Sequence, residues 1–480
     1  MNNRYDAIIV GAGVAGVAAA IRLAEHGARI LLLETRKKLG GRATSFTDVR
    51  TGETLDNCQH VALACCVNYL DLLKRLEVDN LLKWTSRLYW IEAGGRVSTL
   101  KPGLFPAPAH LTESFAKAHF LSLSEKTAIA RAMLAILRKS ASEPRGAGTF
   151  AHWLDVHNQP KSAVDSFWSP IVISACNLPC DRVDAAAALK VFREGFLANK
   201  HASRMSLAAV PLVRLYDPAE ERIRAAKGEV RLGVSAQRIT PRSVLTTDGQ
   251  VFHARHVICA VPPERAAKII DPPLFKTDPR FASLDKFQHS PILGVHLTFD
   301  RPISDLPHAV LVNRPTQWLF NKSNEGEQVQ RWHAVISAAD DWMHLEEHQI
   351  AHRVLVDINA CIPESRNARM VNARPVKEKR ATFADTPDIE PLRPDALGPS
   401  GASGIILAGD YTNTGWPATM EGAARSGYTA ASSILGARAG LALVPELKPS
   451  FMVRALAPGA RTKTAIPEGY RRENAHKARN

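Results

Sequence analysis

The 480-residue sequence has no run of about 18 or more uncharged apolar residues, the length that a membrane-spanning helix requires. Its most apolar N-terminal stretch, residues 7–20, differs from a secretion signal. Asp6 precedes this stretch, spaced glycines interrupt it, and the charged Arg22 and Glu25 follow it. We therefore expect neither a transmembrane helix nor a cleaved signal peptide.

Cysteine is scarce and scattered. The seven cysteines are odd in number, and the close spacings among them are Cys65–Cys66 and Cys176 with Cys180. A secreted disulfide framework uses an even set of cysteines, and a zinc site usually uses two close pairs of ligands. We expect no metal site, and a reducing, cytoplasmic environment with inert thiols.

Acidic residues are fewer than basic residues. Asp and Glu number 47 against 61 Lys and Arg, so the formal net charge is +14. No helix-turn-helix, zinc finger or stripe of basic and aromatic residues is present, so nucleic acid is not an expected partner. The excess of cations suits attraction to an anionic membrane surface, and ordinary solubility explains it equally well.

The overall composition is that of a globular protein. Hydrophobic residues make up 45% and charged residues 22% of the chain, which allows a large core and excludes global disorder. The length corresponds to two or three domains, which large enzymes often interleave.

The first 34 residues carry the most specific pattern. An apolar strand over residues 7–10 leads into Gly11-Ala12-Gly13-Val14-Ala15-Gly16, which opens a helix over residues 18–26. A second apolar strand over residues 30–33 ends at Glu34. Strand, glycine turn, helix, strand and acid in this order predict a dinucleotide-binding fold with a parallel sheet.

Each residue of this turn has a physical task. Gly11 allows the tight turn, Gly13 lets a pyrophosphate approach the backbone, and Gly16 lets the helix pack closely on the sheet. The backbone N–H groups of the helix start, including that of Ala15, face the phosphates. Glu34 is placed to accept both ribose hydroxyls, and its charge disfavours a 2′-phosphate.

A second glycine pair, Gly40-Gly41, stands directly before Arg42. Adjacent glycines permit another close approach of backbone to a diphosphate, and Arg42 supplies a counter-charge. A long dinucleotide such as FAD needs more contacts than the first turn provides, so the pair of motifs favours FAD.

Later segments predict the remaining elements. Residues 228–239, the hairpin around Asp248-Gly249 and the apolar run 256–261 form a β-meander, and residues 281–383 form a second sheet with helices. The apolar strand ending at Gly409-Asp410 precedes a small-residue helix that runs to about Leu435 and directs a further helix N-terminus at the cofactor.

The segment Ser122–Glu125 is a capping box in front of a helix that runs to about Leu137. One face of this helix carries Ile129, Met133, Leu134 and Leu137. We expect that face to pack against the core, with contact to a membrane surface as the alternative.

These motifs resemble a known family. The two glycine elements, Gly409-Asp410 and Met420-Glu421-Gly422 resemble the superfamily of FAD-dependent amine oxidases and phytoene desaturases. Further segments resemble its squalene-associated branch, the hydroxysqualene dehydroxylases: Asp56-Asn57-Cys58-Gln59-His60, Phe167-Trp168-Ser169-Pro170, Ala188-Leu189-Lys190-Val191-Phe192 and the stretch from Asp410 to Gly422. The resemblance covers nearly all of residues 4–437. Cys58 departs from it, because the family has glycine there, and the larger side chain alters the pocket if it lies beside the flavin.

The resemblance implies a reduction. Hydroxysqualene would lose its allylic hydroxyl as water and receive hydride from reduced FAD, giving squalene. His60 would donate the proton and Asp56 would orient or charge it; a buried structural histidine and a turn carboxylate are the alternatives. Glu421 and Asp410 would hold the cofactor, and Ala236 would meet the adenine through its backbone. The cofactor-binding residues expected from motifs and resemblance together are Gly11, Gly13, Ala15, Gly16, Glu34, Gly40, Gly41, Arg42, Ala236, Gly409, Asp410, Thr419, Met420 and Glu421.

Three other functions stay open. A carotenoid or other polyprenoid desaturase would run the flavin in the oxidising direction. A flavin amine oxidase would carry an aromatic residue before Met420, where Thr419 stands. A flavin-bearing scaffold or prenyl-lipid carrier would bind FAD without redox cycling.

We therefore predict an α/β flavoprotein with a Rossmann-type FAD domain (a parallel sheet plus a β-meander) and an interleaved α+β substrate domain. The FAD domain takes residues 1–85, 205–265 and 395–440, and the substrate domain takes 86–204 and 266–394. Residues 441–480 form a basic, loosely ordered tail. Because the isoprenoid substrate partitions into lipid, we expect peripheral association with the inner face of the cytoplasmic membrane. The tail cations either contribute to it by attraction to anionic head groups or belong to a solvated tail with no such role. The reductant and the oligomeric state are not indicated by the sequence.

Overall fold

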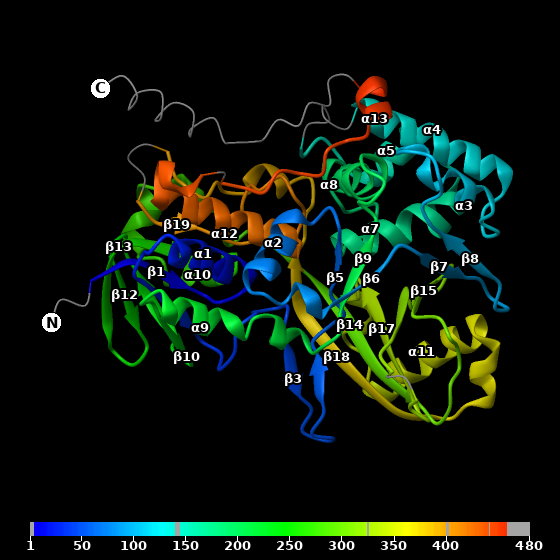
Figure 1. Ribbon diagram of the computed structural model, residues 1–480, viewed down its shortest axis with the longest axis horizontal. Coiled ribbons are helices and arrows are strands. Elements are labelled where there is room, and N and C mark those ends of the chain that lie inside the picture. The colour runs from blue at the N-terminus through cyan, green and yellow to red at the C-terminus, as the bar shows by residue number, and fades with distance from the viewer. Residues whose placement is uncertain (1–3, 140–144, 324–325, 400–402, 441, 458–480) are drawn as a thin grey trace.

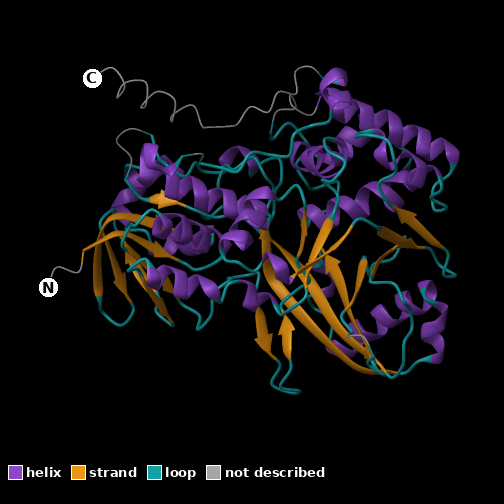
Figure 2. Cartoon of the chain, in the orientation of Figure 1, coloured by secondary structure: helices purple, strands orange, loops and turns teal. Residues whose placement is uncertain are grey.

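The computed structural model describes residues 4–139, 145–323, 326–399, 403–440 and 442–457. Two sheets lie side by side, and the first and last thirds of the chain meet at one of them (Figure 1). The helices between residues 112 and 197, which we call the helical layer, lie over the second sheet (Figure 2).

The first sheet has the hydrogen-bonded order β10-β2-β1-β13-β12-β11, and β19 pairs with β13. Neighbours from β10 to β13, and β13 with β19, run parallel, whereas β11, β12 and β13 form an antiparallel meander. The strands are β1 (Arg4–Val10), β2 (Ile30–Glu34), β10 (Glu229–Leu232), β11 (Ala236–Ile239), β12 (Ser243–Thr246), β13 (Val251–Cys259) and β19 (Ile406–Leu407).

Strand β13 joins the parallel and antiparallel parts. The second arm of the predicted hairpin and the apolar run 256–261 are one continuous strand, not two. One edge of β13 pairs with β1, and its other edge pairs first with β12 and then, at Ile258 and Cys259, with β19. Likewise the predicted strand 228–239 is two strands, because Gly233 takes a positive φ of 75° and ends β10.

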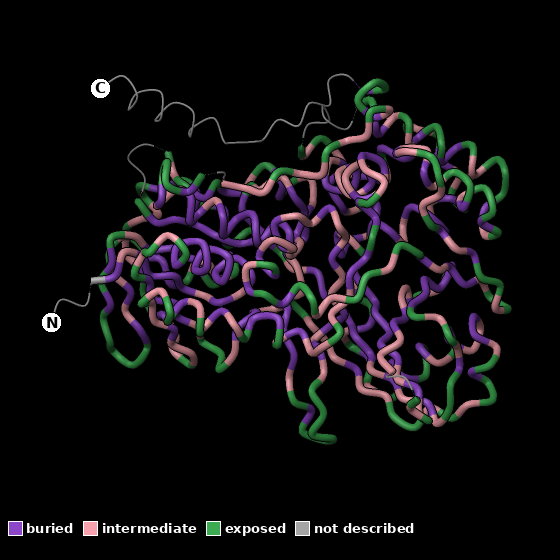
Figure 3. Tube along the Cα trace, viewed as in Figure 1, coloured by how far each residue is buried: buried purple, intermediate pink, exposed green. Residues whose placement is uncertain are grey.

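Helices α1 (Val14–Glu25) and α12 (Met420–Leu435) cover one face of this sheet. Their sequences are rich in alanine and glycine, so the two backbones come close: a Cβ at Gly427 would stand 2.2 Å from the carbonyl oxygen of Ala15. Helix α1 begins four residues earlier than predicted, since Gly13 is already its N-cap. Burial is nearly continuous along these elements (Figure 3).

The second sheet has the order β18-β14-β17-β16-β15-β7-β8. Its strands are β7 (Leu88–Ile91), β8 (Val97–Leu100), β14 (His289–Phe299), β15 (His308–Leu311), β16 (Trp318–Asn321), β17 (Gln330–Ser337) and β18 (Met370–Phe383). Helix α11 (Glu347–Cys361) packs against it. Two small sheets complete the strands: β3 (Ser45–Thr47) with β4 (Thr54–Asp56), and β9 (Met205–Ala208) between β5 (Val61–Leu63) and β6 (Leu82–Thr85).

The other helices are α2 (Val67–Arg75), α3 (Thr112–Ala116), α4 (Leu123–Lys139), α5 (Phe150–Val156), α6 (Lys161–Ala163), α7 (Ser169–Cys176), α8 (Ala185–Phe192), α9 (Pro218–Ala225), α10 (Pro263–Ile269) and α13 (Phe451–Leu456). Two π-helical turns, Val164–Trp168 and Arg193–Leu197, adjoin α6–α7 and α8.

The predicted capping box opens α4. The Ser122 amide donates to the Glu125 carboxylate at 2.6 Å, and the Glu125 amide donates to the Ser122 hydroxyl at 3.3 Å. Ile129 and Leu137 are buried in the core as expected, but Leu134 is 41% exposed. Leu134 follows Ile129 by five residues, so its side chain points roughly 140° away around the helix axis. The prediction that Leu134 shares the face of Ile129 was therefore wrong.

The structure confirms the predicted α/β class with a parallel sheet and a β-meander. Of the predicted basic tail, residues 442–457 lie on the body and include α13, whose Val453 is buried, while residues 458–480 fall outside the described part. Within the described ranges, none of the helices combines the length and apolar character needed to cross a bilayer.

Candidate active site

The first glycine turn forms a close approach between strand and helix. Gly11 has a φ of 101°, and a Cβ there would stand 2.7 Å from the carbonyl oxygen of Ala260. A Cβ at Gly16 would stand 1.9 Å from the carbonyl oxygen of Gly11, so the helix start requires glycine. A Cβ at Gly13 would stand 3.9 Å from the Cα of Gly41, its nearest neighbour, so the backbone here is open to a phosphate.

Glu34 lies beside this turn. One carboxylate oxygen accepts from the Ala12 amide at 2.7 Å and the other from the Arg36 amide at 2.9 Å. The backbone thus fixes the carboxylate while each oxygen keeps a lone pair, as the predicted ribose contact requires.

The second glycine element lies directly against the first. Gly40 donates to the Ala12 carbonyl at 2.9 Å, and a Cβ at Gly41 would stand 2.9 Å from the Cα of Gly13. Both Gly40 and Gly41 have positive φ angles. The two glycine elements therefore form one cradle that a side chain at either position would fill.

Arg42 connects this cradle to the C-terminal segment. Its guanidinium donates to the Asp410 carboxylate at 2.7 Å and to the Ala381 carbonyl at 3.0 Å. Asp410 follows Gly409, whose backbone conformation (φ 156°) lets the chain leave β19. The ion pair thus brings together the two parts of the sequence predicted to bind the cofactor.

The start of α12 completes the cradle, but its acid serves another purpose. Thr419 caps the helix by accepting from the Gly422 amide at 3.1 Å. The buried Glu421 carboxylate accepts from the backbone amides of Asn68 and Tyr69, both at 2.9 Å, and so caps α2. Glu421 therefore positions two helices against each other, while its predicted contact with the cofactor stays a prediction.

A single large, mostly apolar cavity joins these features. Of the predicted site residues, the cavity is lined by Gly11, Gly13, Ala15, Glu34, Gly40, Gly41, Arg42, His60, Ala236, Gly409, Asp410, Thr419, Met420 and Glu421. Gly16 and Asp56 are not in its wall. Beyond the cradle the cavity continues between the second sheet and the helical layer, where Trp90, Ile171, Trp318, Phe320 and Val335 form its walls.

Asp56 and His60 act on each other through charge, without a hydrogen bond between them in the described part of the chain. The Asp56 carboxylate accepts from the Ser45 hydroxyl at 2.8 Å and from the Leu212 amide at 2.9 Å, and lies 3.7 Å from Lys322. The His60 Nδ1 lies 3.1 Å from the Cys58 carbonyl instead, and the charge of Asp56 raises the pKa of His60 against the effect of burial. Asp56 thus anchors the segment, and does not orient the imidazole directly.

The surroundings of His60 determine its protonation. Burial lowers the pKa of His60, so the ring is neutral at neutral pH. A carbonyl only accepts hydrogen bonds, so Nδ1 carries the hydrogen and Nε2 presents a lone pair. In this tautomer His60 can hold a substrate hydroxyl by accepting its hydrogen, but has no proton to donate from Nε2.

Cys58 lies in the cavity wall next to these residues and is buried. Burial raises the pKa of its thiol to about 12, so the side chain is neutral. It occupies space that glycine would leave open and adds no charge to the site.

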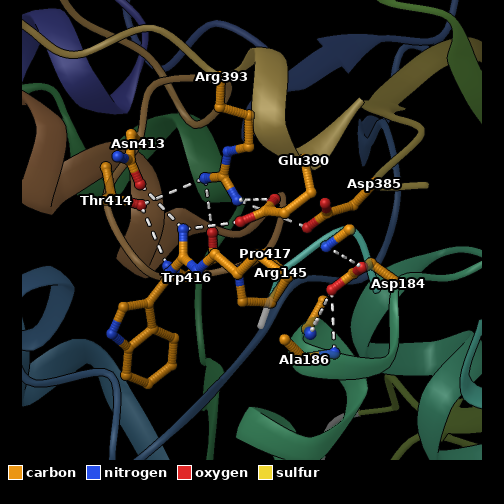
Figure 4. Close-up of polar contacts among 12 residues, drawn as sticks. Arg145, Asp184, Ala186, Asp385, Glu390, Arg393, Asn413, Thr414, Trp416 and Pro417 are labelled. Atoms are coloured by element: carbon orange, nitrogen blue, oxygen red, sulfur yellow. Dashed lines mark hydrogen bonds and ion pairs between the residues drawn. The ribbon is translucent and has the colours of Figure 1, made fainter. Parts of the chain in front are cut away.

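A buried arginine holds the loop between Asp410 and α12. Arg393 donates to the carbonyls of Thr412 and Trp416, both at 2.7 Å, and to the Glu390 carboxylate at 2.8 Å. Figure 4 shows the guanidinium between Glu390 and the loop that carries Trp416. Because the charge is fully buried and its bonds converge on one loop, Arg393 fixes the wall of the cavity. A lone arginine in a polar stretch gave no signal of this role in the sequence.

The cavity wall also contains residues that the sequence did not single out. Arg265 lines it and donates to the Ala236 carbonyl at 3.1 Å, which places a cation at the expected adenine side. Lys190 and Glu194 line it from α8 and the following π-helical turn. These positions come together only through long-range packing.

The geometry fits the comparisons with known proteins. Residues 14–435 match the pattern of the family of flavin-containing amine oxidoreductases. The chain belongs to this family and is a flavin-containing oxidoreductase; its cofactor is FAD, whose diphosphate suits the paired glycine cradle.

Among curated relatives, the chain is 28% identical to a hydroxysqualene dehydroxylase of Rhodopseudomonas palustris over 442 residues, covering 89% of this chain and 98% of that protein. It is 26% identical to a 15-cis-phytoene desaturase of Synechococcus elongatus over 460 residues, covering 89% and 95%.

Among solved structures, a putrescine oxidase variant superposes with a TM-score of 0.68 at 17% identity, covering 90% of this chain and 99% of that one. A cyclohexylamine oxidase from Brevibacterium oxydans superposes with a TM-score of 0.66 at 17% identity, covering 90% and 98%. At these identities the likeness establishes the fold.

Proposed function

We propose that the protein removes the hydroxyl of hydroxysqualene reductively to give squalene. The observation that carries this proposal is the continuity of the cavity: the flavin cradle opens into a long chamber walled by tryptophan, phenylalanine and aliphatic side chains. Such a chamber suits a linear hydrocarbon because burying apolar surface favours binding by about 25 cal/mol per Å². The 28% identity to a hydroxysqualene dehydroxylase supports the particular substrate.

When bound and reduced, FAD supplies hydride. The chain's own residues bind and orient the substrate. The apolar walls exclude water, which protects the allylic cation formed when the hydroxyl leaves. His60 accepts a hydrogen bond from the substrate hydroxyl through Nε2 and so holds the reacting carbon in place. Asp56 keeps the segment carrying His60 fixed to Ser45 and Leu212.

A polyprenoid desaturase is the second candidate, favoured by the relatives named phytoene desaturase. The same chamber would hold a carotenoid precursor, and the flavin would work in the opposite direction. An amine oxidase is disfavoured at Thr419, where no aromatic ring is present and the hydroxyl is engaged with Gly422 and Pro417.

The experiment is product analysis. Purified protein containing FAD is reduced chemically under anaerobic conditions and mixed with hydroxysqualene, and the oxidised protein is mixed with phytoene. Squalene in the first mixture and unchanged phytoene in the second support the proposal. New conjugated absorbance from phytoene, with hydroxysqualene unchanged, would favour the desaturase instead.

We further propose that the protein takes its substrate from an anionic lipid surface. Exposed apolar side chains gather where the segment after β8 meets α13: Leu104 is 95%, Phe105 62% and Phe451 66% exposed. The Ser450 hydroxyl donates to the Ala107 carbonyl, which holds the two segments together. Exposed cations adjoin this patch: Lys101, Lys448 and Arg454. Apolar side chains among cations match a lipid bilayer with anionic head groups.

This patch lies close to the cavity wall in the structure. Phe196 lines the cavity, and two residues later the Ala198 carbonyl accepts from the Ser450 amide at 3.0 Å. A substrate leaving the lipid at this corner would therefore reach the chamber over a short distance.

A further inference from the structure

An acid is required that the described site does not yet supply. A hydroxyl leaves readily only as water, so a proton must reach its oxygen as the C–O bond breaks. His60 is neutral and presents a lone pair at Nε2. The donor must therefore be another group in the wall of the chamber.

The cavity wall contains five carboxyl groups: Glu34, Glu194, Glu378, Asp410 and Glu421. Glu34 accepts hydrogen bonds from two backbone amides, and the Glu421 carboxylate accepts from the backbone amides of Asn68 and Tyr69 and from the Asn68 side chain. Asp410 is ion-paired with Arg42. Each of these three carboxylates is thus held by protein partners. Burial also raises the pKa of Glu421, but its hydrogen bonds to α2 occupy both of its oxygens.

Two carboxyl groups remain. Glu378 accepts from the Asn57 side chain at 3.3 Å. Within the described part of the chain, Glu194 accepts no hydrogen bond, and the Arg193 guanidinium is 3.7 Å from its carboxylate. The Glu194 side chain is 16% exposed, and since Glu194 lines the cavity, that exposure is available to a ligand.

The position of Glu194 on the chain is unusual. It is the second residue of the π-helical turn Arg193–Leu197 that continues α8. Single π-helical turns occur often at functional sites, because the extra residue redirects side chains. Gly195, the next residue, lies against Leu63, and a Cβ there would stand 3.4 Å from its Cδ1. The turn thus passes beside Leu63 of β5, the strand that directly follows His60.

The charged groups around Glu194 come from three elements. Lys190, one turn earlier, is 3.3 Å from Glu446 and lies over the Trp416 ring. Arg425 of α12 is 3.6 Å from Glu421 and 3.7 Å from Glu446. Each of these two cations thus forms an ion pair with a carboxylate other than Glu194.

Burial and the neighbouring charges shift the pKa of Glu194 in opposite directions. Burial raises the pKa of Glu194, and Glu446 adds to this, whereas Lys190, Arg193 and Arg425 oppose it. The direction is upward, as a general acid near neutral pH requires.

We propose that Glu194 is the catalytic acid that protonates the leaving hydroxyl. This inference rests on the proposed function. The carboxylic acid gives its proton to the hydroxyl oxygen, the C–O bond breaks with its electron pair on that oxygen, and water departs. FAD held in the cradle in its reduced form would supply the hydride that this carbon needs, at the cost of a two-electron oxidation of the flavin. The Glu194 carboxylate regains a proton from solvent.

The test compares E194Q with D165N. Asp165 is the second residue of the other π-helical turn, but its side chain is 48% exposed and pairs with Lys161 at the surface. Both variants, as FAD-containing proteins reduced anaerobically, are mixed with hydroxysqualene in single turnover. We expect squalene formation to fall on the order of 100-fold or more in E194Q and to stay unchanged in D165N.

Two further measurements separate acid catalysis from a structural role. An ester of hydroxysqualene loses its acyloxy group as a carboxylate, which needs no proton to leave, so the ester should restore turnover in E194Q. At the pH of the assay, the infrared spectrum of wild type minus that of E194Q should contain the carbonyl stretch of one protonated carboxyl group, and the spectrum of wild type minus that of D165N should not.

The outcomes are distinguishable. Wild-type protein that makes no squalene overturns the proposed function. Wild-type activity with an equally active E194Q overturns the role of Glu194 alone. An E194Q that stays inactive with the ester, or an unchanged infrared band, assigns Glu194 a structural role and likewise overturns this inference.

Discussion

Arg42 and Asp410 stand 368 positions apart in the sequence and form an ion pair at 2.7 Å beside the flavin cradle. Asp410 is almost fully buried, whereas Arg42 is a third exposed. The pair closes the N-terminal glycine elements onto the C-terminal segment, so the contact that joins the two ends of the chain lies where we predict the cofactor to bind.

Arg42→Ala should weaken FAD binding. A charge-assisted hydrogen bond contributes about 2 kcal/mol, on the order of 30-fold in Kd. The measurement is titration of the apoprotein with FAD, followed by flavin fluorescence. Arg50→Ala is the control, because Arg50 forms an exposed pair with Glu347 and such pairs contribute little. Equal FAD affinity in R42A and wild type would contradict the assigned role.

Gly427→Ala should destabilise the protein. At an ordinary helical position this change stabilises by up to about 1 kcal/mol. Here the new Cβ would stand 2.2 Å from the Ala15 carbonyl oxygen and 2.8 Å from the Ala18 Cβ, so α1 and α12 would have to separate. We expect a loss of about 3 kcal/mol in unfolding free energy, measured by denaturant titration.

Gly103→Ala is the control for this change. Gly103 has no positive φ, and a Cβ there meets its neighbours at 3.5 Å, which is ordinary contact. A G427A protein as stable as G103A would show that the close approach of α1 and α12 is not a constraint.

His308→Phe should reduce the loss of stability in acid. Burial among aromatic rings lowers the pKa of His308 to about 4, while the unfolded chain takes up a proton near pH 6.5. The unfolded state therefore binds more protons between these values, and stability present above pH 6.5 is lost as the pH falls toward 4. This histidine accounts for a loss on the order of 3 kcal/mol.

The measurement is unfolding free energy at pH 7 and pH 4.5. H308F should lose less stability between the two than wild type, whereas His253→Gln should behave as wild type because His253 is exposed. The same pH dependence in H308F and wild type would mean that other groups cause the acid sensitivity.

Replacing Leu104, Phe105 and Phe451 by serine should weaken binding to anionic vesicles. These side chains would enter the lipid interface, and each buried CH₂ contributes about 0.8 kcal/mol. Flotation with vesicles containing phosphatidylserine measures the bound fraction. The control is Val49→Ser, since Val49 is 93% exposed on the β3–β4 hairpin. Equal flotation of the triple variant and wild type would exclude this patch as the membrane contact.

Local signals predicted much of the fold. The glycine turn, Glu34 and the second glycine pair identified the cofactor cradle because each requirement acts within a few residues. Strand pairing was predicted less well. Strand β13 pairs with three strands, and nothing in its own sequence indicates that one of its edges pairs with both β12 and β19.

The catalytic side of the site was harder to predict than the cofactor side. His60 was found through the motif that contains it, and it does line the cavity. Its protonation depends on burial and on the Cys58 carbonyl, which only the folded chain arranges. Glu194 and Arg393 had no local signal, since a glutamate on a helix and an arginine in a loop are usually solvated.

The amino-acid sequence by itself determined the cradle for a dinucleotide, since turn geometry, helix polarity and a nearby carboxylate are properties of neighbouring residues. Tertiary structure alone decided which acids are bonded and which face the chamber, and how β5, α8 and α12 converge on one cavity. These depend on contacts between residues hundreds of positions apart, whose energies arise only when water is excluded from between them.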